Sequence, residues 1–173
     1  MKTFEINGNL IGELGLGKNY ENFENTVCKV RGYYIEHLGE SFMNKIDLYI
    51  DNANKEMGNS GHTPIITRIL RKYLIIKLGI TQECREVEIA FQFAHELMHY
   101  VFYVKYEINK ERAGELEESI CSAAALIVIK DLHPESFEYY NKHTKSLSNR
   151  AYREGAKVAK EVEYKFEELL KKI

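Results

Sequence analysis

Apolar residues recur at helical spacing along most of the chain, and this pattern predicts a helix-rich fold. Long helices are expected over about residues 20–38, 83–104 and 111–130. Gly39 follows the last apolar position of the first helix, and Thr81 precedes the second helix as a capping residue. These stretches are long enough to supply most of a hydrophobic core.

Two more helices are expected near the C-terminal end of the sequence. Pro134 suits the first position of a short helix, which contains Phe137, Tyr139 and Tyr140. Ser148 or Asn149 then caps a final helix that continues to the end of the chain. Its apolar face is formed by Val158, Val162, Phe166, Leu169 and Ile173.

Strands are expected only in the first half of the chain. Ile46, Leu48 and Ile50 alternate with polar or aromatic residues, which predicts a half-buried strand. The glycine-rich residues 8–17 predict turns with one short hairpin, and the Asn-, Gly- and Ser-rich residues 52–61 predict a loop. Helices therefore dominate, and the expected fold class is α+β, a helix-rich single domain with a small sheet.

The segment from Pro64 to Ile80 fits two descriptions. Helical spacing of its apolar residues favours a helix over residues 64–72, with Thr63 and Pro64 at its start. Residues 73–78 fit a buried strand equally well. His62, just before this segment, is expected to be a surface histidine rather than a site residue.

Length, charge and cysteine content narrow the class of protein. A chain of 173 residues fits one domain, and a net charge of −2 argues against a dedicated nucleic-acid surface. The longest apolar run, residues 120–129, is too short to span a membrane. Cys28, Cys84 and Cys121 are odd in number and widely spaced, which favours reduced thiols and a cytoplasmic location.

The second predicted helix carries the strongest chemical signal, His95-Glu96-Leu97-Met98-His99. Residues four apart share one face of a helix, so His95 and His99 can direct imidazole nitrogens at a single ion. Glu96 lies beside this pair, where a carboxylate can accept a proton from water without binding the ion. Two core histidines without a metal are the alternative interpretation.

A hydrolytic zinc centre needs a third protein ligand, and the next helix offers several glutamates within residues 111–118. Here the sequence resembles the gluzincin metallopeptidases, in which H-E-x-x-H is followed by a glutamate on the next helix. Phe93-Ala94-His95-Glu96-Leu97 is also similar to the ImmA/IrrE-type metallopeptidase domain. Helical register favours Glu118, whose face carries small residues such as Ser122, and Glu117 remains the alternative.

The resemblance implies a minimal gluzincin architecture in which Zn²⁺, held by His95, His99 and Glu118, hydrolyses peptide bonds with Glu96 as the general base. It also implies an edge strand that pairs with an extended peptide, and peptides or regulatory proteins as substrates. The alternative function is a metal-binding or regulatory protein that acts by partner binding without catalysis. The donor to the reaction's oxyanion stays open among five residues: His133, Tyr139, Tyr140, His143 and Tyr152.

Overall fold

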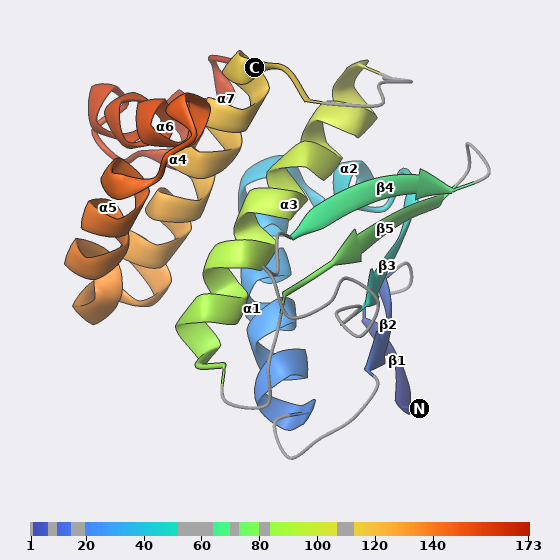
Figure 1. The fold of residues 1–173 in the computed structure, drawn as a ribbon. Helices are drawn as coiled ribbons and strands as arrows, with labels where there is room; N and C mark the ends of the chain where they lie inside the picture. The colour runs from blue at the N-terminus through green and yellow to red at the C-terminus, as the bar shows by residue number, and fades with distance from the viewer. Residues whose placement is uncertain are drawn as a thin grey trace.

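The computed structural model describes residues 2–6, 10–14, 20–51, 64–69, 73–79, 84–106 and 113–173. They form an α+β, helix-rich domain with one small sheet, as the sequence predicts (Figure 1). The strands are β1 (Lys2–Ile6), β2 (Leu10–Leu14), β3 (Asp47–Asp51), β4 (Ile65–Ile69) and β5 (Tyr73–Lys77). The helices are α1 (Tyr20–Leu38), α2 (Glu40–Met43), α3 (Glu86–Tyr106), α4 (Glu115–Leu132), η1 (Pro134–Ser136), α5 (Phe137–Ser146), α6 (Arg150–Glu161) and α7 (Phe166–Leu170).

The sheet is mixed, and its strand order is β1-β2-β3-β5-β4. The N-terminal hairpin β1–β2 is antiparallel, β2, β3 and β5 run parallel, and β4 returns antiparallel to β5 with Ile66 opposite Ile76. Strand β4 therefore lies at one end of the sheet, next to α3, which it contacts. An edge strand keeps backbone groups on one side that no neighbouring strand in the sheet uses.

The core lies between the sheet and the long helices. Leu48, Ile50, Leu74 and Ile76 point from β3 and β5 into one cluster with the apolar face of α1 and nearly all of α3. Helix α4 packs on the opposite side of α3, and α6 packs on α4, so the helices form further layers away from the sheet (Figure 1). Helix α3 is thus enclosed on most sides, which explains its almost continuous apolar sequence.

Small residues allow α4 and α6 to lie very close together. Gly155 of α6 faces Ser119, Ser122 and Ala123 of α4. A Cβ atom added at Gly155 would lie 2.4 Å from Cβ of Ser122 and 2.8 Å from the carbonyl oxygen of Ser119. The close contact between the two helices therefore requires glycine at this position. The backbone conformation of Gly155 does not require it, since its φ is not in the left-handed region.

The structure answers one open question and contradicts one expectation. Residues 65–69 form strand β4 and not a helix, with alternately exposed and half-buried side chains. Isoleucines suit an edge strand through their branched Cβ atoms, and pairing with β5 outweighs their helical spacing. The expected final helix is also interrupted, because α6 ends at Glu161 and α7 begins at Phe166.

The interruption depends on two residues with positive φ that are not glycine, Glu163 at 54° and Tyr164 at 56°. Tertiary contacts hold this turn: the Tyr164 ring packs on Phe137, and Lys130 lies over the same ring at 4.5 Å. The turn directs α7 back onto α1, where Phe166 packs against Tyr34. No glycine, proline or asparagine marks the break in the sequence.

Other elements agree with the sequence. Helix α1 spans the expected residues, and α3 and α4 begin and end within a few residues of their predicted limits. Asn149 caps α6 by accepting a hydrogen bond from the Ala151 N–H at 2.9 Å. The expected loop over residues 52–61, His62 and the Thr81 cap lie outside the described residues. Among the described helices, none is both long and apolar enough to cross a membrane.

Candidate metal centre

The two histidines of the H-E-x-x-H motif lie on the face of α3 that meets the first turn of α4. His95 and His99 are one helical turn apart, and their rings are 5.1 Å from centre to centre. Glu118 reaches across from α4 to both rings. The sequence predicted this meeting because enough residues separate the helices for the chain to turn back.

The distances within the cluster fit a tetrahedral ion. Oε2 of Glu118 lies 3.2 Å from Nε2 of His95 and 3.6 Å from Nε2 of His99. One ligand atom from each of the three residues lies within 4.8 Å of the others. A tetrahedral zinc about 2.1 Å from each ligand separates ligand atoms by about 3.4 Å. Both Glu118 distances match that separation, and both exceed the length of a strong charge-assisted hydrogen bond.

Glu117 occupies a different place. Its Oε1 lies 2.8 Å from Nδ1 of His99, a normal hydrogen-bond distance, and its side chain is buried. A carboxylate on the second nitrogen of a histidine fixes the ring orientation and leaves the first nitrogen for a metal. The structure therefore gives the two adjacent glutamates separate positions, with Glu118 among the candidate ligand atoms and Glu117 behind His99.

Burial and the neighbouring groups shift the pKa of His99 in opposite directions. Burial lowers the pKa of His99, but hydrogen bonds to the Glu117 and Glu118 carboxylates raise that pKa well above its ordinary value. For Glu118, burial raises the pKa, yet hydrogen bonds to His95 and His99 bring it down to about 2. Without a metal, the cluster thus holds a proton on His99 between two carboxylates.

Cys121 lies one turn beyond these glutamates and contacts His99. Burial raises the pKa of its thiol to about 12, so the sulfur stays protonated near neutral pH. Its sulfur is not among the three grouped ligand atoms. Cys121 is a small buried side chain in this structure.

Glu96 lies beside the two histidines and is only 3% exposed. Burial raises the pKa of this carboxyl, while His95 and His99 lower it in part. It also accepts a hydrogen bond from the backbone of Ile66 in β4. A carboxylate with a raised pKa is a better proton acceptor near neutral pH than an exposed one.

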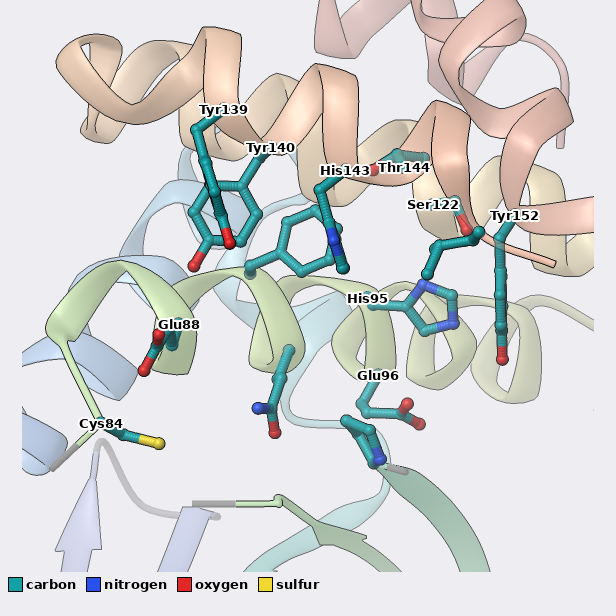
Figure 2. Close-up of a pocket in the computed structure, with 14 residues that line it drawn as sticks. Cys84, Glu88, His95, Glu96, Ser122, Tyr139, Tyr140, His143, Thr144 and Tyr152 are labelled. Atoms are coloured by element: carbon teal, nitrogen blue, oxygen red, sulfur yellow. The ribbon is translucent and has the colours of Figure 1, made fainter. Parts of the chain in front are cut away.

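A cavity of about 430 Å³ opens beside His95 and Glu96 and runs between α3 and α5. Tyr152 of α6 lies at the end nearest the histidines, with its ring 5.5 Å from the His95 ring. Figure 2 shows the Tyr152 side chain extending past His95 on the side where Glu96 lies. Burial raises the pKa of this phenol, and Glu118 and Glu96 raise it further, so the hydroxyl keeps its proton.

The other candidate donors from the sequence lie on α5 or follow α4. Tyr139, Tyr140 and His143 line the part of the cavity formed by α5 (Figure 2). His133 follows the opposite end of α4 from Glu118, where it pairs with Glu135 at 3.8 Å. Of these five residues, Tyr152 is the one with a ring contact to a histidine of the motif.

Two contributors were not foreseen from the sequence. The Ile66 backbone reaches Glu96 only because β4 is the strand beside α3, and no residue type signals such a contact. Glu88 lines the far end of the cavity, and its position four residues before Gln92 and seven before His95 on one helix face was the available signal.

Comparisons with protein-family models, with curated proteins and with solved structures found no match. The candidate centre is therefore supported by its own geometry and by the motif.

Proposed function

We propose that this protein is a zinc-dependent peptidase. The observation that carries the proposal is the convergence of ligand atoms from His95, His99 and Glu118 within 4.8 Å of one another, with the buried Glu96 carboxylate beside them. Two imidazoles and one carboxylate are a donor set used by catalytic zinc, and the set leaves a fourth position for water or substrate.

The residues present suit zinc in both chemistry and support. Nitrogen and carboxylate oxygen ligands match its preferences, and Glu117 holds His99 through Nδ1 so that Nε2 is presented to the ion. Bound zinc supplies Lewis-acid chemistry, lowering the pKa of water and polarising a carbonyl group. The general base and the hydrogen-bond donor for hydrolysis are side chains of the protein.

Glu96 supplies the general base. Its carboxylate is positioned by the Ile66 backbone and by α3, and burial raises its pKa toward the range where proton transfer is efficient. It accepts the proton from the attacking water and then delivers that proton to the leaving amine. Tyr152 supplies the hydrogen-bond donor, because its protonated hydroxyl lies on the same side of His95.

The substrate is a peptide or protein segment in extended form. Strand β4 is an edge strand beside the centre, and an extended peptide can add to such an edge through main-chain hydrogen bonds. Regulatory proteins are candidate substrates by the resemblance to the ImmA/IrrE type. Cys28, Cys84 and Cys121 are thiols that form no disulfide, which is in keeping with a reducing cytoplasmic environment.

Glu96→Gln tests the proposal. We expect the zinc-loaded variant to lose at least about a hundredfold in cleavage of an unfolded protein such as fluorescent casein, with unchanged zinc content. Glu115→Gln is the matched control, because Glu115 is exposed in the first turn of α4. This variant should cleave casein at the wild-type rate.

Tyr152→Phe tests the donor role separately. It should lower kcat by about ten- to a hundredfold with little change in KM, whereas Tyr164→Phe, remote from the centre, should not. Cleavage by Glu96→Gln at the wild-type rate would contradict the assignment of the base. A zinc-loaded wild type that cleaves no tested peptide or protein would favour the alternative, a regulatory protein that acts by partner binding.

A further inference from the structure

We infer that the cavity beside the metal centre selects a long basic side chain, arginine or lysine, next to the bond that is cleaved. This inference rests on the proposed function, since it assigns the cavity to a side chain of the peptide substrate. The cavity of about 430 Å³ is continuous with His95, Glu96 and Tyr152, so a side chain placed in it lies close to the candidate ion.

The length of the cavity suits an extended side chain. It follows the face of α3 that carries Glu88, Phe91, Gln92 and His95 (Figure 2). Glu88 precedes His95 by seven residues, which corresponds to about 10 Å along a helix. A peptide whose carbonyl group lies at the centre can therefore direct a long side chain toward Glu88.

The walls of the cavity are aromatic along this path. Phe91 of α3 packs on Tyr140 of α5 with ring centres 4.7 Å apart, and Tyr139 lies 5.2 Å from Tyr140. The methylene groups of arginine or lysine pack well on such rings, and their cationic heads are attracted to the ring faces. Tyr139 is 61% exposed, so part of its ring is available to a ligand.

The described lining of the cavity contains carboxylates but no lysine or arginine. The carboxylates are those of Glu88 and Glu96. The Gln92 amide is already occupied, because it both donates to and accepts from the Gly79 backbone. Glu88 is therefore the group at that end best able to bind a cationic head.

The side-chain ion pair of Glu88 is weak enough to be replaced. The Arg85 backbone N–H donates a hydrogen bond to one Glu88 oxygen at 3.0 Å. The other Glu88 oxygen contacts the Arg85 guanidinium at 3.4 Å, and the Arg85 side chain is 63% exposed. An exposed ion pair of this length contributes little, so a substrate guanidinium enclosed by aromatic rings competes with it effectively. An acidic substrate side chain at this position would instead be repelled by Glu88.

Two peptides that differ only in charge test the inference. The probes are alanine heptapeptides with either arginine or citrulline at the central position, because citrulline keeps the shape of arginine without its charge. Zinc-loaded wild-type protein should cleave the arginine peptide with about tenfold higher kcat/KM. Glu88→Gln should abolish this preference, whereas Glu86→Gln, an exposed control on the same helix, should keep it. Equal cleavage of both peptides by the wild type, or a preference that survives in Glu88→Gln, would overturn the inference.

A binding measurement separates this inference from the proposed hydrolysis. Fluorescence anisotropy of labelled peptides is recorded with the Glu96→Gln protein, which retains the cavity. We expect the Glu96→Gln protein to bind the arginine peptide more tightly than the citrulline peptide, and the double variant that also carries Glu88→Gln to lose this difference. That result supports the cavity assignment even if the wild type cleaves neither peptide. Equal affinity for both peptides overturns it, whether or not the wild type is a peptidase.

Discussion

The Glu117 carboxylate lies 2.8 Å from Nδ1 of His99, while Glu118 faces Nε2 of the same ring at 3.6 Å. Adjacent residues of one helix thus contact opposite nitrogens of one imidazole. If Glu118 binds zinc and Glu117 orients the ring, the two glutamates differ in what their loss does to metal binding. Glu117→Gln should weaken zinc binding by about ten- to a hundredfold without abolishing it.

Competition with a chromophoric chelator measures that affinity. Glu115→Gln is the control, because Glu115 lies on the same turn but is exposed. Complete loss of zinc from Glu117→Gln, together with tight binding by Glu118→Gln, would exchange the two assignments.

Zinc binding is expected to release protons. The Glu117 and Glu118 carboxylates hydrogen-bond to His99 and raise its pKa well above its ordinary value, so near pH 7 the metal-free protein carries a proton on this ring. A zinc ligand must be neutral imidazole, so binding at pH 7 should displace about one proton from His99. The number should fall as the pH rises through the pKa of His99 in the folded protein.

Calorimetric titration in buffers of different ionisation enthalpy counts these protons. Glu117→Gln should release fewer of them, because it removes one carboxylate that holds the proton. Binding at pH 7 with no proton release would contradict the arrangement around His99.

The buried Glu96 carboxylate should lower the free energy of unfolding of the metal-free protein at neutral pH. Burial raises the pKa of Glu96 in the folded state, so its contribution to stability is fully present below the unfolded pKa of 4.5 and is lost as the pH rises through the folded pKa. Glu96→Gln removes this titration and can still accept the Ile66 hydrogen bond. Its free energy of unfolding at pH 7 should therefore exceed that of the wild type.

Urea unfolding of metal-free protein at pH 4 and pH 7 checks this expectation. The advantage of Glu96→Gln should be small at pH 4 and larger at pH 7. An advantage that is the same at both values would show that the charge of Glu96 is not its source.

Gly155→Ala should destabilise the protein. The new methyl group would lie 2.4 Å from Cβ of Ser122, so α6 must move away from α4, at a cost of about 1–3 kcal/mol. Gly32→Ala is the matched control, since nothing lies within 4 Å of its added Cβ and alanine favours a helix interior by about 0.5–1 kcal/mol. Thermal unfolding compares the two variants. Equal stability of both variants would contradict the close packing. Tyr152 precedes Gly155 by one turn of α6, so Gly155→Ala should also reduce cleavage.

The sequence alone predicts the two histidine ligands of the candidate site. A four-residue spacing places His95 and His99 on one helix face, whatever else the chain does. The choice between Glu117 and Glu118 depends on how α4 is rotated against α3, because neighbouring helical residues point about 100° apart. Small residues follow both glutamates in register, so only the packing of the two helices separates their positions.

The sequence predicts the secondary structure correctly where a single periodicity dominates. It does not do so where contacts between distant residues determine the secondary structure. Helix α1 follows from a single amphipathic pattern, but β4 has helical spacing and becomes a strand by pairing with β5. The break before α7 depends on positive φ at Glu163 and Tyr164. Contacts of Tyr164 with Phe137 and Lys130 hold it, and such contacts between distant residues leave no local pattern.

The central claim is tested most directly by the zinc-to-protein ratio of purified protein, determined by elemental analysis for the wild type and for Glu118→Ala. The geometry of His95, His99 and Glu118 predicts a ratio near one for the wild type and a marked loss for Glu118→Ala. A wild-type ratio near zero, even after reconstitution with zinc, would contradict the metal centre and leave His95 and His99 as buried core residues.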